Sequence, residues 1–495
     1  MPTQNITKTQ FSSLKAKLPS GRYSEDDLEL IHRAYKVSKK AHEGQTRLTG
    51  APYFEHAFAT ASKLADMQLP AEVVAAGLLH DVLEDADMDE AEMQREFGRD
   101  ITNLVKGVTK LGRVQYRGLE RYVENLRKMF IAMATDIRVI FIKFADRMHN
   151  IETLYVLPEA KRTRIAKEVM EIYAPIANRL GMGEYRGLFE DHAFKYLQPK
   201  EYNWTKHLLE QRVKKFGPAM SKAQLDTKRE LENHRIFPNT IHGRIKYCHS
   251  LYKKLQRYDN DINKVYDIVA IRVIVDDVSD CYAALGIIHG LYTPLAGRIK
   301  DYISRPKPNG YKSLHTTVFS DDGSILEFQI RTLEMHEEAE YGVAAHWRYK
   351  EGRRLRDKKV KWMEELTNIQ KEMSEGDFME QMDELKLDMF RNRIFVFSPN
   401  GDVLDLPENS TPIDFAYAIH TDIGDKASGA KVNHQIANLD SVLKSGDMCE
   451  IIVDKNRKSP NPDWLKFAKT SHARSKIKEA IKRNRHSILG SLMRR

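Results

Sequence analysis

The sequence has few cysteines and no long apolar run, and both absences restrict the class of protein. Its 495 residues hold three cysteines, Cys248, Cys281 and Cys449, without the spacing of a zinc site. Such sparse cysteine usage is typical of the reducing cytosol, so we expect a cytoplasmic protein with free thiols. No apolar run reaches the roughly 18 residues of a membrane span, and the N-terminus lacks the apolar core of a signal peptide. We therefore expect no membrane partner.

Two common nucleotide-binding signatures are also missing. The stretch "NGYKS" at 309–313 is only a partial match to a P-loop. The glycine cluster "GMGEYRG" at 181–187 follows no strand pattern, which a dinucleotide-binding turn requires, so it reads as a connection between helices. Any nucleotide site in this chain must hold phosphates by other means.

Positive charge is concentrated at the C-terminal end. From Lys455 onwards there are 13 Lys/Arg against 2 Asp/Glu, whereas the whole chain carries a net charge of +9. A basic tail indicates a nucleic-acid or other polyanionic partner. A solvated helix or a disordered tail explains the same composition equally well.

The residue pattern changes several times along the chain and predicts a multidomain protein. Apolar residues recur at helical spacing in the first 200 residues, strand-like segments such as "KVYDIVAIRVIVDD" and "SILEFQIRT" follow, and "RIFVFSPNGDVLDLP" predicts a hairpin in a small β-rich domain. We expect these parts: a leader (1–25), an all-α domain (26–197), an α/β domain (198–346), a charged helical linker (347–392), a small β domain (393–454) and the basic tail (455–495).

The all-α part carries the first candidate site. In "GLLHDVLEDAD", helical spacing places His80, Asp81, Glu84 and Asp85 on one face after an apolar stretch. In "KFADRMHNIETL", Asp146, Asn150 and Thr153 share another helical stripe. Nitrogen and oxygen donors of this kind suit Mn, Fe or Zn rather than Ca, and such a metal could activate a water for phosphoester hydrolysis. From spacing alone, a solvated acidic face is an equal alternative.

The α/β part carries the second candidate site. Asp267 stands at the start of one candidate strand, "YDIVAIRVIV", and Glu327 lies on another, so both carboxylates can point into one cleft and bind Mg²⁺ if the strands are neighbours. Glu327 is also placed to accept a hydroxyl proton. Cations for phosphates come from "HGRIKYCHSLYKKL" and from "GRIKDYISRPKPNGYKSLH", which includes Lys300. An ordinary surface pair of Glu327 and Arg331 is the alternative.

Several ordered motifs of the all-α part resemble one known family. "GQTRLTGAPYFEHAFATA", "GLLHDVLEDAD" and "KFADRMHNIETL" are similar to the HD-type hydrolase domain of RelA/SpoT homologues, which removes the 3′-pyrophosphate of (p)ppGpp. The resemblance implies that Mn²⁺ is held by His56, His80, Asp81 and Asp146, that Glu84 and Asp85 position and activate water, and that Arg47, Asn150 and Thr153 line the nucleotide pocket. Ala86 stands where the family usually has Thr, which removes a hydroxyl but no ligand.

The α/β part resembles the synthetase domain of the same family, which transfers pyrophosphate from ATP to the 3′-hydroxyl of GDP or GTP. The similarity runs through "HGRIKYCHSLYKKL", "VYDIVAIRVIV", "GRIKDYISRPKPNGYKSLHTTV", "LEFQIRT" and "HEEAEYGVAAHWRYK". It implies that Asp267 and Glu327 bind Mg²⁺, that Glu327 activates the hydroxyl, that Arg244, Lys246 and Lys254 hold ATP phosphates, that Tyr311 stacks on guanine, and that Lys307, Asn309 and His315 complete the acceptor pocket. The basic "RIKD" at 298–301 resembles the bifunctional members.

Residues 393–453, with "DFAYAIHTDIGDKASGAKVN", resemble a TGS domain of β-grasp type. In long family members this module contacts uncharged tRNA on the ribosome, which makes His420 and Lys426 candidate RNA contacts. The family often has Arg at the position of Lys426, and Lys binds phosphate less well in a bidentate way. Long members continue into further modules with no counterpart here, so a naturally short form and a piece of a longer chain both stay open.

Three functions are consistent with these patterns. The first is a bifunctional enzyme that makes and degrades (p)ppGpp, with its two activities switched reciprocally. The second is a synthetase with a silent hydrolase domain, against which the retained His56, His80, Asp81 and Asp146 argue. The third is an inert RNA- or ribosome-binding regulator, against which Asp267 and Glu327 argue.

Overall fold

The computed structural model contains two compact units, Met1–Ile369 and Gln370–Arg495. It describes residues 10–85, 88–112, 132, 135–307, 310–347, 393–399, 403–444, 446–454, 456–457 and 459–492. Apart from Trp347, the linker expected at 347–392 lies outside these residues. Among the helices within those ranges, none combines the length and the apolar character that crossing a membrane requires.

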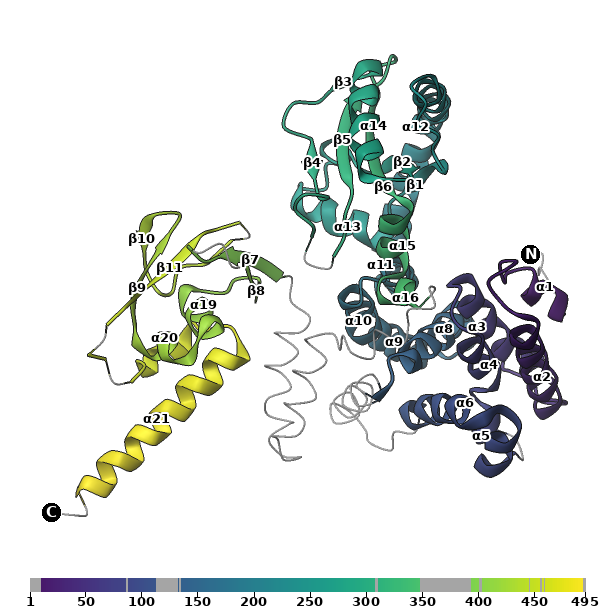
Figure 1. Ribbon diagram of the computed structural model, residues 1–495, viewed down its shortest axis with the longest axis horizontal. Helices are drawn as coiled ribbons and strands as arrows, with labels where there is room; N and C mark the ends of the chain where they lie inside the picture. Colours follow the sequence, from purple (N-terminus) through teal and green to yellow (C-terminus); the bar gives the residue numbers. More distant parts are fainter. Residues whose placement is uncertain are drawn as a thin grey trace. The chain divides into compact units, whose positions relative to one another are not determined.

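The first part of unit one is built from helices around a central one, α4 (Figure 1). Eight of the nine residues of α4, all except Glu72, are buried, because its apolar sequence contacts α2, α3, α6 and α8. Gly77 permits the closest approach: a Cβ there would lie 2.3 Å from Leu64 of α3. The elements are α1 (Phe11–Lys15), α2 (Glu25–Ala41), α3 (Phe54–Asp66), α4 (Ala71–Leu79), α5 (Val82–Asp85), α6 (Glu90–Gly112), α8 (Arg138–Glu152), η1 (Leu154–Val156), α9 (Glu159–Glu168), η2 (Val169–Tyr173), α10 (Ala174–Arg179), α11 (Gly183–Leu197) and α12 (Pro199–Asn233).

The first 25 residues are not simply a loose leader where the structure describes them. Leu14 of α1 and the following Leu18 are buried, and the ring of Phe11 stacks on His32 of α2 at 4.4 Å between centroids. Ser24 caps α2 in a capping box with Asp27, as its position before the acidic first turn predicts. Residues 11–18 thus belong to the helical core because their apolar side chains contact it.

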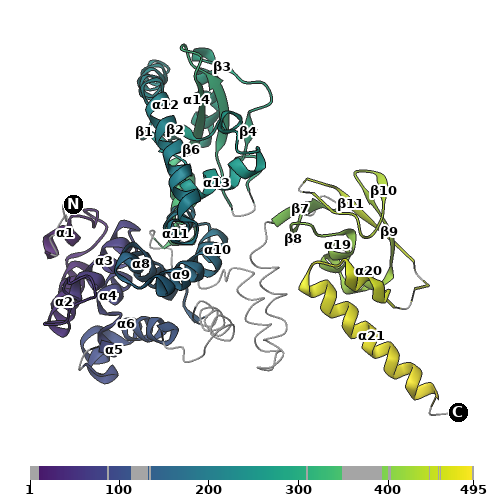
Figure 2. The ribbon, with the colours of Figure 1, turned by 180° about the vertical axis from the view of Figure 1, so that it is seen from behind.

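The second part of unit one is a mixed sheet with helices (Figure 2). The strand order is β1-β2-β6-β5-β3, with β4 paired to β5. β2 and β6 are parallel neighbours, and the other pairs are antiparallel. β2 and β6 thus meet the condition that the two candidate strands are neighbours, whereas Asp267 lies just before β2 and not at its start. The elements are β1 (Thr240–Ile245), α13 (Cys248–Arg257), η3 (Ile262–Lys264), β2 (Val269–Val275), α14 (Val278–Leu291), β3 (Thr293–Pro294), β4 (Lys300–Asp301), β5 (Leu314–Phe319), β6 (Ile325–Thr332), α15 (Leu333–Tyr341) and α16 (Val343–His346).

The two faces of this sheet differ in chemistry. Leu326, Phe328 and Ile330 of β6 pack into one apolar core with residues of α12 and α14. The alternate side chains Glu327, Gln329 and Arg331 are also buried, at 7%, 2% and 0% exposure. The alternation predicted a polar face, and the structure shows that this face is covered. This excludes the ordinary surface pair of Glu327 and Arg331.

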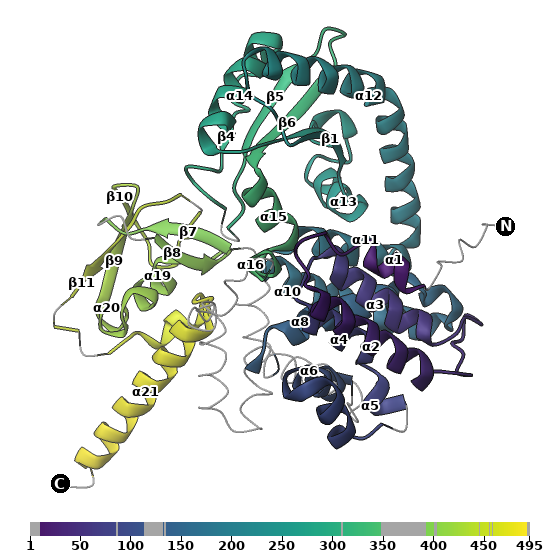
Figure 3. The ribbon, with the colours of Figure 1, turned by 45° about the vertical axis from the view of Figure 1, so that its right-hand side comes forward.

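Helix α11 joins the two parts of unit one (Figure 3). The side chain of Tyr247, the N-cap residue of α13, accepts no hydrogen bond from the first turn of that helix. Asp191 of α11 supplies the acceptor instead. The Asp191 carboxylate accepts the backbone N–H groups of Cys248 at 2.9 Å and His249 at 2.8 Å. A helix N-terminus has unsatisfied donors and favours a negative charge, so Asp191 stabilises α13 from outside the sheet domain.

Unit two is a small β domain followed by a helix. Thr411 and Asp414 form a capping box of α19, with Pro412 at its first position. Buried Asp414 also accepts the N–H groups of Lys469 and Thr470, and Trp464 joins the core of the domain, so the basic tail begins as packed structure. The elements are β7 (Arg393–Phe397), β8 (Val403–Pro407), α19 (Pro412–Ile419), α20 (Thr421–Lys426), β9 (Ala427–Val432), β10 (Gln435–Ala437), β11 (Cys449–Val453), η5 (Pro462–Lys466) and α21 (Ser471–Leu492).

Candidate functional site

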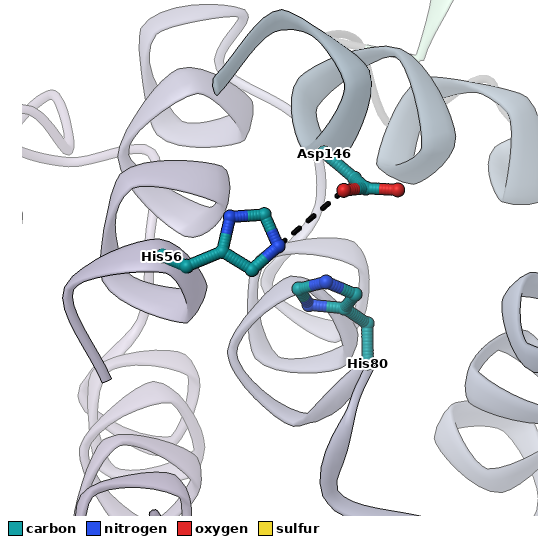
Figure 4. A group of neighbouring side chains, drawn as sticks. All are labelled: His56, His80 and Asp146. Carbon is teal, nitrogen blue, oxygen red and sulfur yellow. Dashed lines mark ion pairs between the residues drawn. The ribbon is translucent and has the colours of Figure 1, made fainter. Parts of the chain in front are cut away.

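Three buried residues of the helical part converge on one point (Figure 4). His56 comes from α3, His80 from the end of α4 and Asp146 from α8. One ligand atom from each lies within 4.8 Å of the others, and His56 Nε2 is 3.3 Å from Asp146 Oδ1. Asp81 Oδ2 adds a fourth donor, 3.2 Å from His80 Nε2 and 3.6 Å from His56 Nε2. The structure thus brings together all four residues expected to hold a metal.

The free donor atoms of this cluster fit a divalent cation. His80 Nδ1 lies 2.8 Å from the carbonyl of Gly77, so it donates there and its Nε2 is the ring atom that faces the cluster. Apart from the Asp81 carboxylate 3.2 Å away, that buried Nε2 has no partner among the described residues. Two imidazoles with carboxylates are a donor set for a borderline transition metal, so the cluster fits such an ion.

The electrostatics of the cluster favour charged carboxylates. Burial alone would raise the pKa of Asp146, but the Lys143 ammonium, 2.8 Å from Oδ2, and His56 together hold it well below its usual range. Burial is likewise outweighed at His80, whose pKa rises to about 9 because of Asp81. The pKa of Asp81 falls in turn because of His80. The hydroxyl of Tyr53 donates to Asp81 Oδ2 at 2.9 Å and so orients that carboxylate.

A second layer of contacts links the cluster to Arg47. The Arg47 guanidinium donates to Asn150 Oδ1 at 2.6 Å, and its Nη1 lies 3.1 Å from His149 Nδ1. Asn150 Nδ2 donates to Asp146 Oδ1 at 2.5 Å, and His149 Nδ1 lies 2.8 Å from His56 Nδ1. Burial and the charges of His56 and Arg47 lower the pKa of His149 to about 3, so its ring is neutral.

The remaining residues predicted for this site lie at its edge. Glu84 and Asp85 are exposed on α5, with the carboxylate of Asp85 close enough to Tyr53 to raise its pKa. The Thr153 hydroxyl donates to the carbonyl of His149 at 3.0 Å, at the end of α8. Glu84, Asp85 and Thr153 are therefore near the cluster, but none of them contacts its three central residues through a described hydrogen bond.

In the sheet domain, Glu327 belongs to a chain of hydrogen bonds. Its Oε1 lies 2.8 Å from His315 Nδ1 and accepts the amide of Gln329 at 3.0 Å. His315 Nε2 lies 2.8 Å from the hydroxyl of Tyr311. Burial would raise the pKa of Glu327, but the hydrogen bond from His315 outweighs it, so the carboxylate stays charged.

Asp267 is surrounded by lysines. Lys246 Nζ and Lys254 Nζ both contact Asp267 Oδ2, at 2.6 and 2.5 Å, and lower its pKa against the effect of burial. Asp267 Oδ1 is buried without a hydrogen-bond partner among the described residues. The charge of Asp267 also acts on the pKa of Glu327, so the two carboxylates share one electrostatic environment. An unpartnered carboxylate oxygen is a fit for a hard cation such as Mg²⁺.

The predicted acceptor loop is only partly described. Lys307 Nζ lies 4.8 Å from the ring centroid of Tyr311 and 4.5 Å from that of Tyr302, which are cation–π contacts. Burial and Lys300 lower the pKa of Lys307 to about 8. Lys300 lies exposed on the short edge strand β4, opposite His315, and Asn309 lies outside the described residues.

The polar face of the sheet holds residues that the motifs did not single out. Glu340 of α15 accepts from Arg272 at 2.9 Å and from Arg331 at 3.1 Å, and His336 contacts Arg331 at 2.8 Å. The predicted Arg244 lies on β1, in the same cross-strand row as Ala270 and Glu327. Arg272 and Arg331 lie on segments that the sequence predicts as strands. Their alternation with apolar residues is the sequence signal that could have placed them on the polar face.

The predicted RNA contacts lie together on unit two. His420 Nδ1 accepts the N–H of Asp422 at 3.2 Å and so caps α20. Lys426 Nζ pairs with the Asp422 carboxylate at 2.9 Å. His420 is exposed and Lys426 is partly exposed.

Three protein families match parts of the chain. The HD domain family matches residues 34–183, the region found in RelA / SpoT proteins matches residues 243–354, and the TGS domain family matches residues 394–453. The expected fold classes are therefore correct: an all-α HD domain, an α/β synthetase-type domain and a TGS domain.

Proteins with this organisation are similar over nearly the whole chain. A guanosine-3′,5′-bis(diphosphate) 3′-pyrophosphohydrolase of Aquifex aeolicus is 46% identical over 92% of this chain and 65% of its own length, and a GTP pyrophosphokinase of Myxococcus xanthus is 42% identical over 93% and 61%. The chain thus spans under two thirds of these two relatives. The bifunctional (p)ppGpp synthase/hydrolase SpoT of Escherichia coli K12 is 42% identical over 95% of this chain and 67% of its own length. With its converging imidazoles and carboxylates and its parallel pair of strands, the chain belongs to the RelA/SpoT family.

Proposed function

We propose that this chain is a bifunctional alarmone enzyme that hydrolyses (p)ppGpp in its HD domain and synthesises it in its α/β domain. The observation that carries the proposal is that unit one contains two separate carboxylate clusters. One includes His56, His80 and Asp146, and the other includes Asp267 and Glu327. We assign both reactions to the cytoplasm.

In the hydrolase, His56, His80, Asp81 and Asp146 would hold Mn²⁺. A bound ion of this type supplies Lewis acidity and lowers the pKa of a coordinated water. Glu84 and Asp85 position the water and accept its proton. Arg47, Asn150 and Thr153 bind the nucleotide. The water oxygen forms a bond to phosphorus, the bond to the 3′-oxygen breaks, and GDP or GTP leaves with its proton alongside pyrophosphate.

In the synthetase, Asp267 and Glu327 would hold Mg²⁺, and a bound ion would supply positive charge that offsets the charge of the reacting phosphates. Glu327 accepts the proton of the 3′-hydroxyl, and its hydrogen bond to His315 keeps the carboxylate charged and oriented. The 3′-oxygen then bonds to the β-phosphorus of ATP and AMP leaves. The phosphates are held by Arg244, Lys246, Lys254 and Lys300, and the guanine nucleotide by Lys307, Asn309, Tyr311 and His315.

A paired assay tests both halves on one preparation. Synthesis is measured with ATP, GDP or GTP, and Mg²⁺, and hydrolysis with ppGpp and Mn²⁺. We expect Glu327→Gln to abolish synthesis alone and Asp81→Asn to abolish hydrolysis alone. Synthesis without hydrolysis in the wild type would favour the alternative of a silent hydrolase domain. Product formation that neither substitution changes would contradict both site assignments.

A contact of unit two with tRNA or the ribosome is a second proposal. It is supported by the exposed His420 and by basic residues along α21, including Lys476 and Lys478. Phosphate contacts make affinity fall steeply with salt. Binding of uncharged tRNA by the full chain, weakened in a His420→Ala, Lys426→Ala variant, is the expected result. Equal binding by that variant and the wild type would contradict these contacts.

A further inference from the structure

The contact between His56 and His149 determines which ring nitrogen carries the proton. The two Nδ1 atoms are 2.8 Å apart, a hydrogen-bond length, so one of them donates and the other accepts. Arg47 Nη1 lies 3.1 Å from the same Nδ1 of His149. A guanidinium can only donate. His149 Nδ1 is therefore the acceptor, and His56 Nδ1 carries the hydrogen.

This assignment has a consequence on the other side of the His56 ring. A neutral imidazole with hydrogen on Nδ1 has its lone pair on Nε2. His56 Nε2 is the atom that faces Asp146 Oδ1 at 3.3 Å and Asp81 Oδ2 at 3.6 Å. The lone pair thus points into the cluster of His56, His80 and Asp146. The ring of His56 is in the tautomer that a metal ligand needs, and it has that tautomer because His149 accepts from it.

The two histidines of the cluster are oriented in different ways. His80 donates from Nδ1 to the carbonyl of Gly77, which belongs to its own helix. His56 relies on a side chain from another helix, α8, which also carries Asp146. His149 lies three residues after Asp146, so one helix supplies a carboxylate ligand and the acceptor that orients an imidazole ligand. A side-chain acceptor can be replaced by mutation, whereas a carbonyl cannot.

We propose that His149 is a positioning residue of the hydrolase: it fixes the metal-facing tautomer and orientation of His56. The proposal deepens the proposed hydrolase function and rests on it for the chemistry, but its direct consequence is an affinity for a divalent cation. Partners that orient metal-ligating histidines typically change metal affinity by about 10- to 100-fold when removed. His149 contacts the ligand and not the reacting atoms, so its effect on turnover follows from the metal.

The test compares three substitutions in the full chain without nucleotide. His149→Phe keeps a planar ring and removes the acceptor, whereas His149→Asn places a carbonyl oxygen near the former Nδ1. His192→Phe makes the same change on α11, where no described hydrogen bond joins His192 to the cluster. The Kd for Mn²⁺ is measured by electron paramagnetic resonance of the free ion, and thermal unfolding and ATP-dependent synthesis report on the integrity of each sample.

We expect His149→Phe to raise the Kd for Mn²⁺ about 10- to 100-fold. We expect His149→Asn and His192→Phe to stay within about threefold of the wild type, because the acceptor is restored in one and was never involved in the other. An unchanged Kd in His149→Phe, or an equal loss in His149→Asn and His149→Phe, would overturn the proposal. If the wild type binds Mn²⁺ but leaves ppGpp intact, the hydrolase function fails while the Kd comparison still decides the role of His149.

Discussion

The two carboxylate clusters of unit one differ in the groups that contact and compensate their buried negative charge. In the HD domain, the Nε2 atoms of His56 and His80 face Asp81 and Asp146, and among the described residues the Lys143 ammonium contacts Asp146. In the α/β domain, two lysines already contact Asp267, and His315 contacts Glu327. The first cluster combines imidazoles with carboxylates, whereas in the second cluster two lysines and a histidine already contact the carboxylates.

This difference indicates how each cluster would bind the metal proposed for it. The HD cluster is organised to accept a cation directly, because two imidazoles and two carboxylates already converge on one point. A cation that reaches Asp267 must instead compete with the ammonium groups of Lys246 and Lys254, and separating buried ion pairs is costly. Under the proposed synthetase function, ATP phosphates would relieve that competition by giving both lysines another anion. We therefore expect metal binding to be independent of nucleotide in one site and dependent on ATP in the other.

The largest expected effect is on Mn²⁺ binding without nucleotide. Asp146→Asn should raise the Kd for Mn²⁺ at the HD cluster more than about 100-fold. Loss of a ligand should exceed the roughly 10- to 100-fold effect that is typical of residues that orient ligands. Asp267→Asn should leave that Kd within about threefold, and only the ATP-dependent Mn²⁺ site should be lost. Loss of Mn²⁺ binding without nucleotide in Asp267→Asn would contradict the assignment of that binding to the HD cluster. Titration by electron paramagnetic resonance with and without a non-hydrolysable ATP analogue gives both values.

An intermediate effect is expected for the lysines of α13. Lys254→Met removes a cation that contacts Asp267, and we expect the KM for ATP to rise about 10- to 100-fold, as for loss of a hydrogen bond to a charged group. Lys253→Met is the matched control, because Lys253 Nζ is directed at Glu190, 3.8 Å away, and is half exposed. Steady-state kinetics with varied ATP separates the two neighbours. Equal KM values for both variants would show that Lys254 does not reach the phosphates.

The smallest expected effect is a pH dependence of synthesis. With its pKa lowered to about 8 by burial and Lys300, Lys307 is cationic at pH 7 and mostly neutral at pH 9. A cation that binds phosphate is then lost as pH rises, so kcat/KM for GDP should fall about tenfold between pH 7 and 9. Lys307→Arg keeps its charge and should remove this fall. A decline of the same size in Lys307→Arg would assign the titration to another group.

Most of the fold could be predicted from local sequence patterns. The Val- and Ile-rich stretch before residue 275 is β2, the alternation after Ser324 is β6, and Thr411-Pro412 begins α19. These signals are strong because spacing, capping and composition agree within a few residues. The packing of residues 11–18 and of Trp464 was missed because isolated apolar residues in polar surroundings do not show what they contact.

The site was predicted less completely for a related reason. Motifs supplied His56, His80 and Asp146, which contact one another, and they gave no role to Lys143 or His149. Those two residues act on the ligands through three-dimensional contacts. Lys143 lies in an apolar stretch of the sequence, where burying a cation is unfavourable without an anionic partner. The carboxylate of Asp146 provides that partner. Glu84 and Asp85 satisfy the spacing rule but are exposed.

The carboxylate of Asp191 also sets a limit on how the two halves can be separated. The region found in RelA / SpoT proteins begins at residue 243, yet the first N–H groups of α13 are satisfied from α11. A fragment that begins between residues 192 and 247 would leave the helix that carries Lys254 with exposed donors at its start. A self-sufficient piece of this chain that contains the sheet domain therefore needs to include Asp191 of α11, which lies before the start of the family match at residue 243.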